Sequence, residues 1–234
     1  GAVNVNYDGE NNLISGQLEV MMDCQFNVSD FEIIISDFVE DDTLPPIIDD
    51  FNIMQTSGGT AIDSLFTIEL ENGQIIGSSN DGGFVPSGEQ SLIVVDFETA
   101  SDNICFSTSN ITTSIGISYE AVLGDCIPLA KYSQGWNWIS FNRSFEDMSI
   151  GSVFEDLDNN PSYIKSQVGY ADYYEEYGWF GPLETVDNYS MYKLDMNFSD
   201  ALALRGDGID VSTTIFSLLE GWNWIGYSPQ VSLD

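Results

Sequence analysis

The residues of this chain that could perform chemistry are mostly carboxylates and aromatic rings. The sequence has 38 Asp and Glu residues, five Lys and Arg residues and no histidine. Without histidine there is no Ser-His-Asp triad, no Cys-His pair and no histidine zinc site. No phosphate loop or dinucleotide fingerprint is present either. A carboxylate pair could still hydrolyse a glycoside, but the pattern as a whole favours a non-enzymatic protein.

An acidic segment in the first half of the chain could bind calcium. Glu40-Asp41-Asp42 is followed by two prolines and then by Asp49-Asp50. Ca²⁺ is bound by carboxylate and carbonyl oxygens, so this segment is a candidate cation site. The alternative is a solvated loop whose charges and prolines prevent strand pairing. The candidate ligands are Asp41, Asp42, Asp49 and Asp50.

Aromatic side chains gather in the second half, where they could contact a polysaccharide or another protein. The cluster begins near Tyr170 and ends in the sequence Gly178-Trp179-Phe180-Gly181. Aromatic residues with a polar tip are common at binding surfaces, although they also fill cores. The candidate contact residues are Tyr173, Tyr174, Tyr177 and Trp179.

A Trp-rich hexapeptide occurs twice, which indicates an internal repeat. Gly135–Ser140 (GWNWIS) returns as Gly221–Gly226 (GWNWIG), with five of six residues identical. Side chains alternate along a strand, so the two tryptophans of each copy lie on one face and the asparagine on the other. We expect the tryptophan face to belong to the core. The residues concerned are Trp136, Trp138, Trp222 and Trp224.

The tripeptide Arg205-Gly206-Asp207 matches an integrin-adhesion motif. A tripeptide of this kind is common by chance, so it does not indicate adhesion by itself.

Composition divides the chain near residue 130. Residues 1–130 contain 22 acidic side chains and no Lys or Arg, whereas all five basic residues and all five tryptophans follow. We therefore expect one domain over residues 1–128 and a second over residues 129–234, with the second repeat copy beginning at residue 221.

The first domain is predicted to be an antiparallel β-sandwich. Short β-rich stretches alternate with turns such as Asp8-Gly9 and Gly58-Gly59, a pattern typical of sandwiches and barrels. The expected strands are Leu13–Met22, Phe31–Phe38, Ser64–Leu70, Gln74–Ser78, Ser91–Phe97, Asn103–Thr108 and Thr113–Val122.

Five pieces of this domain, in order, resemble a cohesin-like jelly roll. They are Ile14–Leu18, Gly58–Ala61 leading to Phe66, Ile75–Ser79, Val85–Gly88 and Ile104–Ser107. The resemblance implies a two-sheet sandwich used for recognition or assembly, without catalysis.

Three cysteines are present, and an odd number in a secreted chain suggests one disulfide and one leftover thiol. Domains that this one resembles end with a cysteine pair of similar spacing. The resemblance therefore implies a disulfide between Cys105 and Cys126. Cys24, beside two methionines, is expected to be a buried small apolar residue.

The second domain is predicted to be β-rich with one short helix. Ile150, Val153, Phe154 and Leu157 follow the spacing of a helix face, and Ser149 is a candidate N-cap. The order of GWNWIS, short helix, Tyr163–Gln167 and Tyr-rich stretch resembles a repeat module of marine microbial surface and secreted proteins. The expected fold class of the whole chain is all-β.

The net charge of −33 decides which partners are plausible. Nucleic acid and anionic membranes are poor partners because both require clustered Lys and Arg. No apolar run is long enough for a membrane helix. The charge is tolerable where salt screens it, so we expect an extracellular, saline setting. The leading hypothesis is a structural or adhesive protein that assembles as a homo-oligomer or polymer through strand edges. The alternative is a carbohydrate-binding module of a secreted protein, and the only cofactor considered is Ca²⁺.

Overall fold

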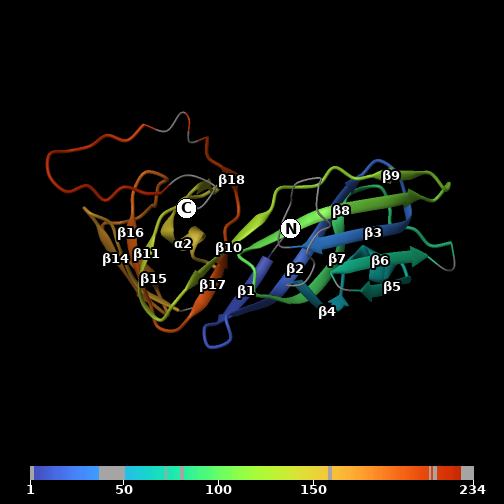
Figure 1. Cartoon of the computed structure of the whole chain (residues 1–234), viewed down its shortest axis with the longest axis horizontal. Coiled ribbons are helices and arrows are strands. Elements are labelled where there is room, and N and C mark those ends of the chain that lie inside the picture. Colours follow the sequence, from blue (N-terminus) through green and yellow to red (C-terminus); the bar gives the residue numbers. More distant parts are fainter. Residues whose placement is uncertain are drawn as a thin grey trace. The chain divides into compact units, whose positions relative to one another are not determined.

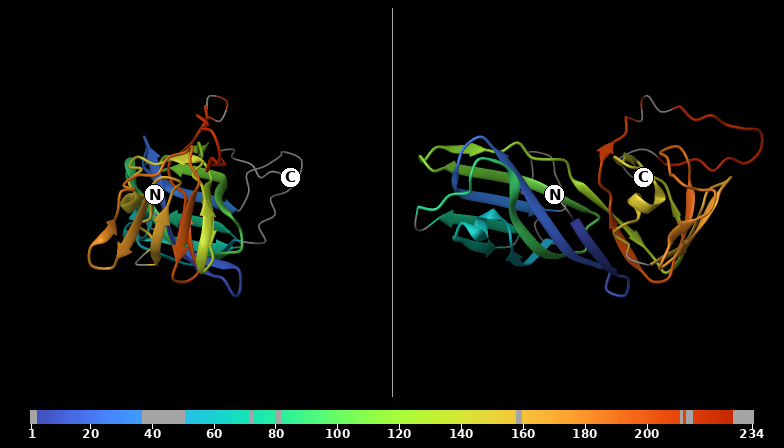
Figure 2. Two further views of the ribbon diagram at one scale, coloured as in Figure 1. Left: turned by 90° about the vertical axis from the view of Figure 1, so that its left-hand side faces the viewer. Right: turned by 180° about the vertical axis from the view of Figure 1, so that it is seen from behind.

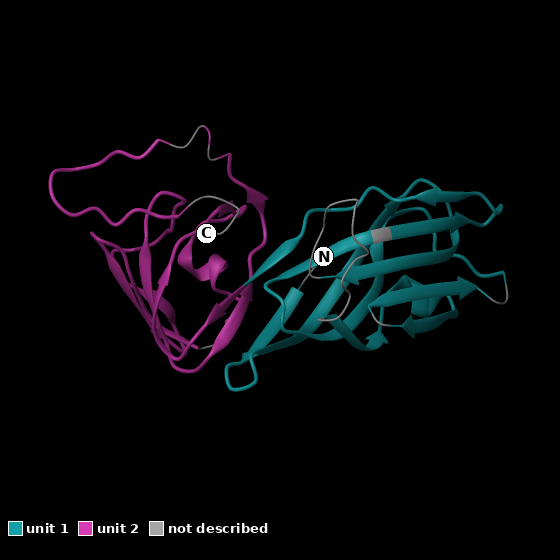
Figure 3. Ribbon diagram, viewed as in Figure 1, with its two compact units in different colours: residues 1–129 teal, residues 130–234 magenta. Residues whose placement is uncertain are grey.

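The computed structural model describes residues 3–36, 51–71, 73–79, 82–157, 160–210, 212 and 215–227. The chain forms two compact units, residues 1–129 and residues 130–234 (Figure 3). The sequence predicts this boundary between residues 128 and 129.

Unit 1 is a sandwich of two antiparallel sheets (Figure 1). One sheet has the strand order β1-β2-β7-β4, and its longest strands, β2 and β7, pair from Ile14↔Thr99 to Cys24↔Gly88. The bounds are β1 (Val3–Asp8), β2 (Leu13–Cys24), β4 (Phe51–Ser57) and β7 (Gly88–Thr99).

The other sheet of unit 1 has the order β10-β8-β3-β6-β5, with β9 paired to β8. The bounds are β3 (Val28–Ser36), β5 (Phe66–Glu71), β6 (Gln74–Ser79), β8 (Asn103–Thr113), β9 (Ser118–Glu120) and β10 (Ile127–Tyr132). A single helical turn, α1 (Thr60–Asp63), precedes β5.

Alternation along the strands builds the core of unit 1. Leu18 and Phe97 on one sheet and Ile35 and Ile75 on the other are fully buried. Gly77 of β6 leaves room for the ring of Phe31, since a Cβ at this position would lie 2.2 Å from that ring. Antiparallel sheets with one apolar face each are stable only when those faces pack together.

The predicted disulfide is confirmed, because Cys105 of β8 is bonded to Cys126. Cys24 is a free, buried cysteine at the end of β2, as expected for a small apolar residue.

Unit 2 contains a five-stranded antiparallel sheet that curls around a short helix (Figure 1, Figure 2). The strand order is β11-β16-β13-β14-β15. The bounds are β11 (Gly135–Ile139), β13 (Pro161–Lys165), β14 (Tyr170–Tyr174), β15 (Gly178–Phe180) and β16 (Tyr192–Met196). Three further strands complete the unit: β17 (Asp200–Ala203), β12 (Arg143–Ser144) and β18 (Asp207–Gly208), of which β12 pairs with β18.

The predicted helix is present but shorter than expected. Its N-cap is Ser149, whose hydroxyl accepts a hydrogen bond from the Ser152 N–H, and α2 covers only Ile150–Val153. The chain then continues in a turn in which the Leu157 N–H donates to the Phe154 carbonyl. The apolar residues that were expected on the helix face are all buried, although only Ile150–Val153 is helical.

The core of unit 2 lies between α2 and the inner face of the curled sheet. Leu194 and Ile164 are fully buried on that face, and Phe141 and Tyr192 are buried beside them. The prediction of an all-β fold is thus confirmed for both units.

Candidate binding face of unit 2

The strand register of the unit 2 sheet places its polar and aromatic side chains in two rows on the face away from α2. Leu194, Ile164 and Ala171 are paired neighbours and fully buried, so the residues on either side of them point outward. The first row is Trp136, Asp195, Tyr163, Asp172 and Phe180, and the second is Trp138, Lys193, Lys165 and Tyr170. We call these nine residues the outer face.

The tryptophans of the first repeat copy belong to this outer face and not to the core. Trp136 and Trp138 are 55% and 60% exposed, whereas Ile139 is buried. The expected alternation is present, but the prediction of which face is buried was wrong. The inner side of β11 is covered by the core around α2, which leaves the indoles on the solvent side.

The second copy also departs from the expected core position. Trp222 is 92% exposed. Trp224 is half-buried because its ring lies 5.7 Å from that of Trp138, with the Lys193 ammonium 5.4 Å from the Trp224 ring centre. Trp224 therefore packs on the outer face and contributes nothing to the core.

The four candidate contact residues divide between two places. Tyr174 and Tyr177 are exposed, and both rings contact Phe180 of the outer face. Tyr173 and Trp179 point the other way, since Trp179 packs against Phe154 of the core. These two line a hollow of about 480 Å³ beside α2.

Contacts between neighbouring side chains hold the rings of the outer face in place. The Trp136 and Tyr163 rings meet edge to face at 5.8 Å, and Tyr163 stacks on Tyr170 at the same distance. The Lys193 ammonium lies 3.9 Å from the Trp138 ring centre, a cation–π contact. A surface held in this way loses little side-chain entropy on binding a ligand.

The outer face is electrically balanced in a strongly acidic chain. It contains two lysines, Lys165 and Lys193, and two aspartates, Asp172 and Asp195. Desolvation, followed by the negative charge of Asp172, raises the pKa of the Tyr163 hydroxyl above its usual range. The Tyr163 hydroxyl therefore stays protonated and able to donate a hydrogen bond at neutral pH.

The calcium candidates Asp41, Asp42, Asp49 and Asp50 lie outside the described residues. Within the described ranges, no group of three or more Cys, Asp or Glu side chains is arranged to hold a metal ion.

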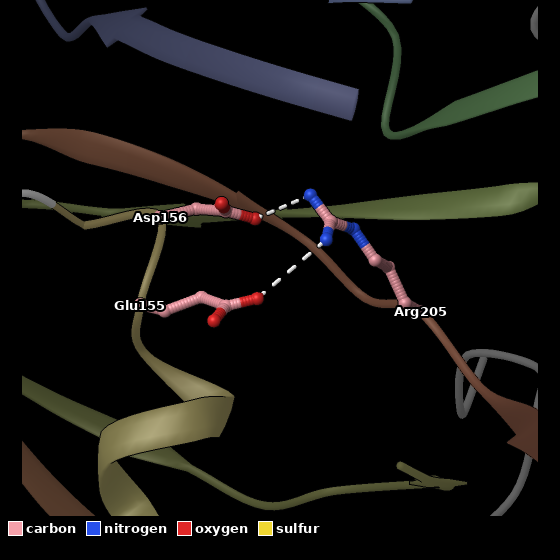
Figure 4. A network of polar contacts seen from close by, with 3 residues as sticks. All are labelled: Glu155, Asp156 and Arg205. Carbon is pink, nitrogen blue, oxygen red and sulfur yellow. Dashed lines mark hydrogen bonds and ion pairs between the residues drawn. The ribbon is translucent and has the colours of Figure 1, made fainter. Parts of the chain in front are cut away.

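The Arg-Gly-Asp tripeptide contributes to the packing of unit 2. The Arg205 guanidinium lies 2.6 Å from Asp156 and 3.7 Å from Glu155, which follow α2 (Figure 4). Gly206 has a φ of 93°, and a Cβ there would lie 2.2 Å from the Ser144 carbonyl oxygen. The Arg205 guanidinium thus links the turn after α2 to the segment between β17 and β18. Less of this guanidinium is then available to an adhesion partner.

Comparison of the chain with protein-family models, curated proteins and solved structures found no match. The resemblances to a cohesin-like sandwich and to a GWNWIS-type module therefore stay predictions. None of the described helices is long and apolar enough to cross a membrane.

Proposed function

We propose that this protein is a non-enzymatic extracellular adhesive protein that binds polysaccharide through the outer face of unit 2. The observation that carries the proposal is the exposure of Trp136 and Trp138 in register with further aromatic rings across the sheet. Isolated exposed apolar residues need no explanation, but several aromatic rings on one face of a sheet, interleaved with charged side chains, indicate a binding surface.

Aromatic rings at fixed positions suit a sugar chain for a chemical reason. The C–H groups on one side of a pyranose ring form an apolar patch that packs on the negative face of an indole or phenol ring. The sugar hydroxyls can then bond to the polar groups between the rings. On the outer face those groups are Tyr163, Asp172 and Asp195.

The charge distribution favours a neutral polysaccharide. The outer face carries as many lysines as aspartates, while the chain as a whole has a net charge of −33. A polyanionic glycan would be repelled at long range by the remainder of the protein. An extracellular location is supported by the Cys105–Cys126 disulfide, since disulfides persist in oxidising compartments.

The test is a binding titration of the intact chain with soluble neutral polysaccharides, followed by intrinsic tryptophan fluorescence and calorimetry. Wild-type protein is expected to bind, and Trp136→Ala and Trp138→Ala are each expected to weaken binding about tenfold, equivalent to about 1.4 kcal/mol. Both side chains are exposed, so the variants should fold normally.

The matched control is Tyr119→Ala, which removes an exposed aromatic ring from unit 1. This variant should bind like wild type. Absence of binding to any neutral polysaccharide, or equal loss in the control, would refute the proposal.

A further inference from the structure

The second repeat copy has the same local geometry as the first. The Asn137 side-chain oxygen accepts from the Ser133 N–H at 3.0 Å, and its amide donates to the Ser133 and Gly135 carbonyls at 2.7 and 2.9 Å. Asn223 makes the equivalent bonds to Leu219 and Gly221 at 2.9, 2.9 and 3.1 Å. We call this arrangement the Asn clamp.

Glycine completes the clamp in both copies. The φ values of Gly135 and Gly221 are 86° and 96°, in the region that favours glycine. The turn that precedes a GWNWI strand is therefore formed at both places.

The two copies differ in what their backbones pair with. Gly135–Ile139 is β11, paired along its length with β16. Gly221–Ile225 belongs to no strand and forms one isolated bridge, Ser190↔Ile225. The Gln167 side chain bonds to the Trp222 carbonyl at 2.8 Å and to the Trp224 N–H at 2.7 Å.

One backbone edge of the second copy is open. The Asn223 N–H and carbonyl form no hydrogen bond with any residue that the structure describes. A strand edge of this kind is a template for pairing with another chain.

The residues before the second copy are apolar and exposed. Leu129 and Tyr132, which precede the first copy, are buried in β10. Ile215 and Leu218, at the equivalent places before the second copy, are 82% and 64% exposed. The stretch leaves the sheets of unit 2 as a wide loop, coloured red after β18 (Figure 1, Figure 2).

We propose that the segment Ile215–Ile225 is an association surface whose partner is a second copy of this chain, which it joins as an added strand on the free edge of β11. β11 is the last strand of its sheet, and no strand of the described residues pairs with its other edge. Strand addition to such an edge is a common mode of recognition.

The internal repeat identifies the partner. β11 and the second copy both have the sequence Gly-Trp-Asn-Trp-Ile, so pairing would set two tryptophans of one chain beside two of the other. Aromatic pairs across neighbouring strands stabilise a sheet. A contact of this type already exists within the chain, where Trp224 lies against Trp138.

Charge points to the same partner. Two chains with a net charge of −33 repel each other, so they can meet only where charge is sparse. β11 contains no charged residue, and Ile215–Ile225 contains one, Glu220. Because the segment of one chain contacts a different surface on the next, the contact is head-to-tail and should join molecules into rings or open chains.

The test is the solution mass of the intact chain by light scattering over a range of concentrations, in salt of about 0.5 M so that repulsion is screened. Wild type should show a mass that rises with concentration to at least twice 25.9 kDa. Leu218→Asp and Trp222→Asp should each lower the association constant about tenfold or more, and both side chains are exposed enough to leave folding intact.

Val122→Asp is the matched control, since Val122 is a fully exposed apolar residue of unit 1. It should associate like wild type. A synthetic peptide of residues 215–225 should cap β11 and reduce the mass, whereas a scrambled peptide should not. A wild type of constant 25.9 kDa, or association unaffected by both segment variants and by the peptide, would overturn the proposal.

Discussion

Tyr192 connects the core of unit 2 with a turn, and its ionisation lowers the stability of the protein at alkaline pH. Its ring is buried, and its hydroxyl accepts a hydrogen bond of 2.8 Å from the Asp187 N–H. Burial raises the pKa of Tyr192 from 10.0 to about 12. The folded state thus holds this proton more tightly than the unfolded chain does, and the resulting stabilisation is complete below pH 10 and is lost as the pH rises towards 12.

We therefore expect the free energy of unfolding to fall between pH 10 and about 12. Burial also raises the pKa of Tyr132, so part of the loss comes from that residue. The measurement is denaturant unfolding across this range, with Tyr192→Phe for comparison. The variant should show a shallower fall, and an identical pH dependence would contradict the assignment.

The disulfide is the second prediction at the scale of residues. Cys105 and Cys126 are separated by 21 positions, and closing a loop of that size stabilises a fold by about 3 kcal/mol. The double variant Cys105→Ala/Cys126→Ala should lose about this amount in a denaturant titration. Cys24→Ala, which removes the free buried thiol, should cost less than half of it. If the double variant and Cys24→Ala lost the same free energy of unfolding, the disulfide would not be the main contribution of the cysteines to stability.

At the scale of elements, the two Asn clamps allow the stability contributed by the turn to be compared with the stability contributed by strand pairing. Asn137 closes the turn before β11, which is paired along its length, whereas Asn223 closes the same turn before a segment that forms a single isolated bridge. Asn137→Ala should destabilise unit 2 by about 1 kcal/mol, because it removes the hydrogen bonds of the Asn137 side chain to the exposed Ser133 backbone and to the half-buried Gly135 carbonyl.

Asn223→Ala is the matched variant and should cost less than about 0.5 kcal/mol in dilute solution, since no strand depends on that turn. The measurement is the free energy of unfolding of both proteins under the same conditions. A larger effect at Asn223 than at Asn137 would contradict the difference in pairing.

The elements also show how far the sequence determines the site. Strand alternation places Trp136 and Trp138 on one face, and turn residues such as Gly58-Gly59 mark strand ends in unit 1. Alternation cannot tell which face is buried, because that depends on what covers the sheet. In unit 2 the cover is α2 and the turn after it, which come from Ser149–Leu157. The sequence alone does not indicate that this stretch packs on the other side of β11.

The rows of the outer face depend on strand order, which local patterns do not report. β11 pairs with β16, and β16 with β13, so neighbours in space are distant in the chain. Trp138, Lys193 and Lys165 become one surface only through this order. Tyr163 and Tyr170 could have been suspected from the Tyr-rich stretch, but the two lysines gave no local signal.

At the scale of the whole molecule, the net charge of −33 makes stability depend on salt. Self-repulsion weakens the compact state, and added salt screens it. Raising NaCl from dilute buffer to about 0.5 M should raise the Tm by at least about 4 °C, corresponding to more than about 1 kcal/mol. A Tm that is constant or falls with salt would contradict this reasoning.

Calcium offers a separate test at the same scale. CaCl₂ matched to NaCl in ionic strength should raise the Tm further if the acidic segment binds the ion. Asp41→Asn/Asp42→Asn should then abolish the extra increase while the NaCl effect remains. Equal Tm values in the two salts would rule out a stabilising calcium site in that segment.

The central claim, that the outer face of unit 2 binds a neutral polysaccharide, is tested most directly by nuclear magnetic resonance. The chain contains five tryptophans, so its indole N–H signals are few and can be assigned by substitution. Adding the polysaccharide should shift the signals of Trp136 and Trp138 and leave that of Trp179, which packs against Phe154, unchanged. Unshifted signals from Trp136 and Trp138 under saturating polysaccharide would contradict the account.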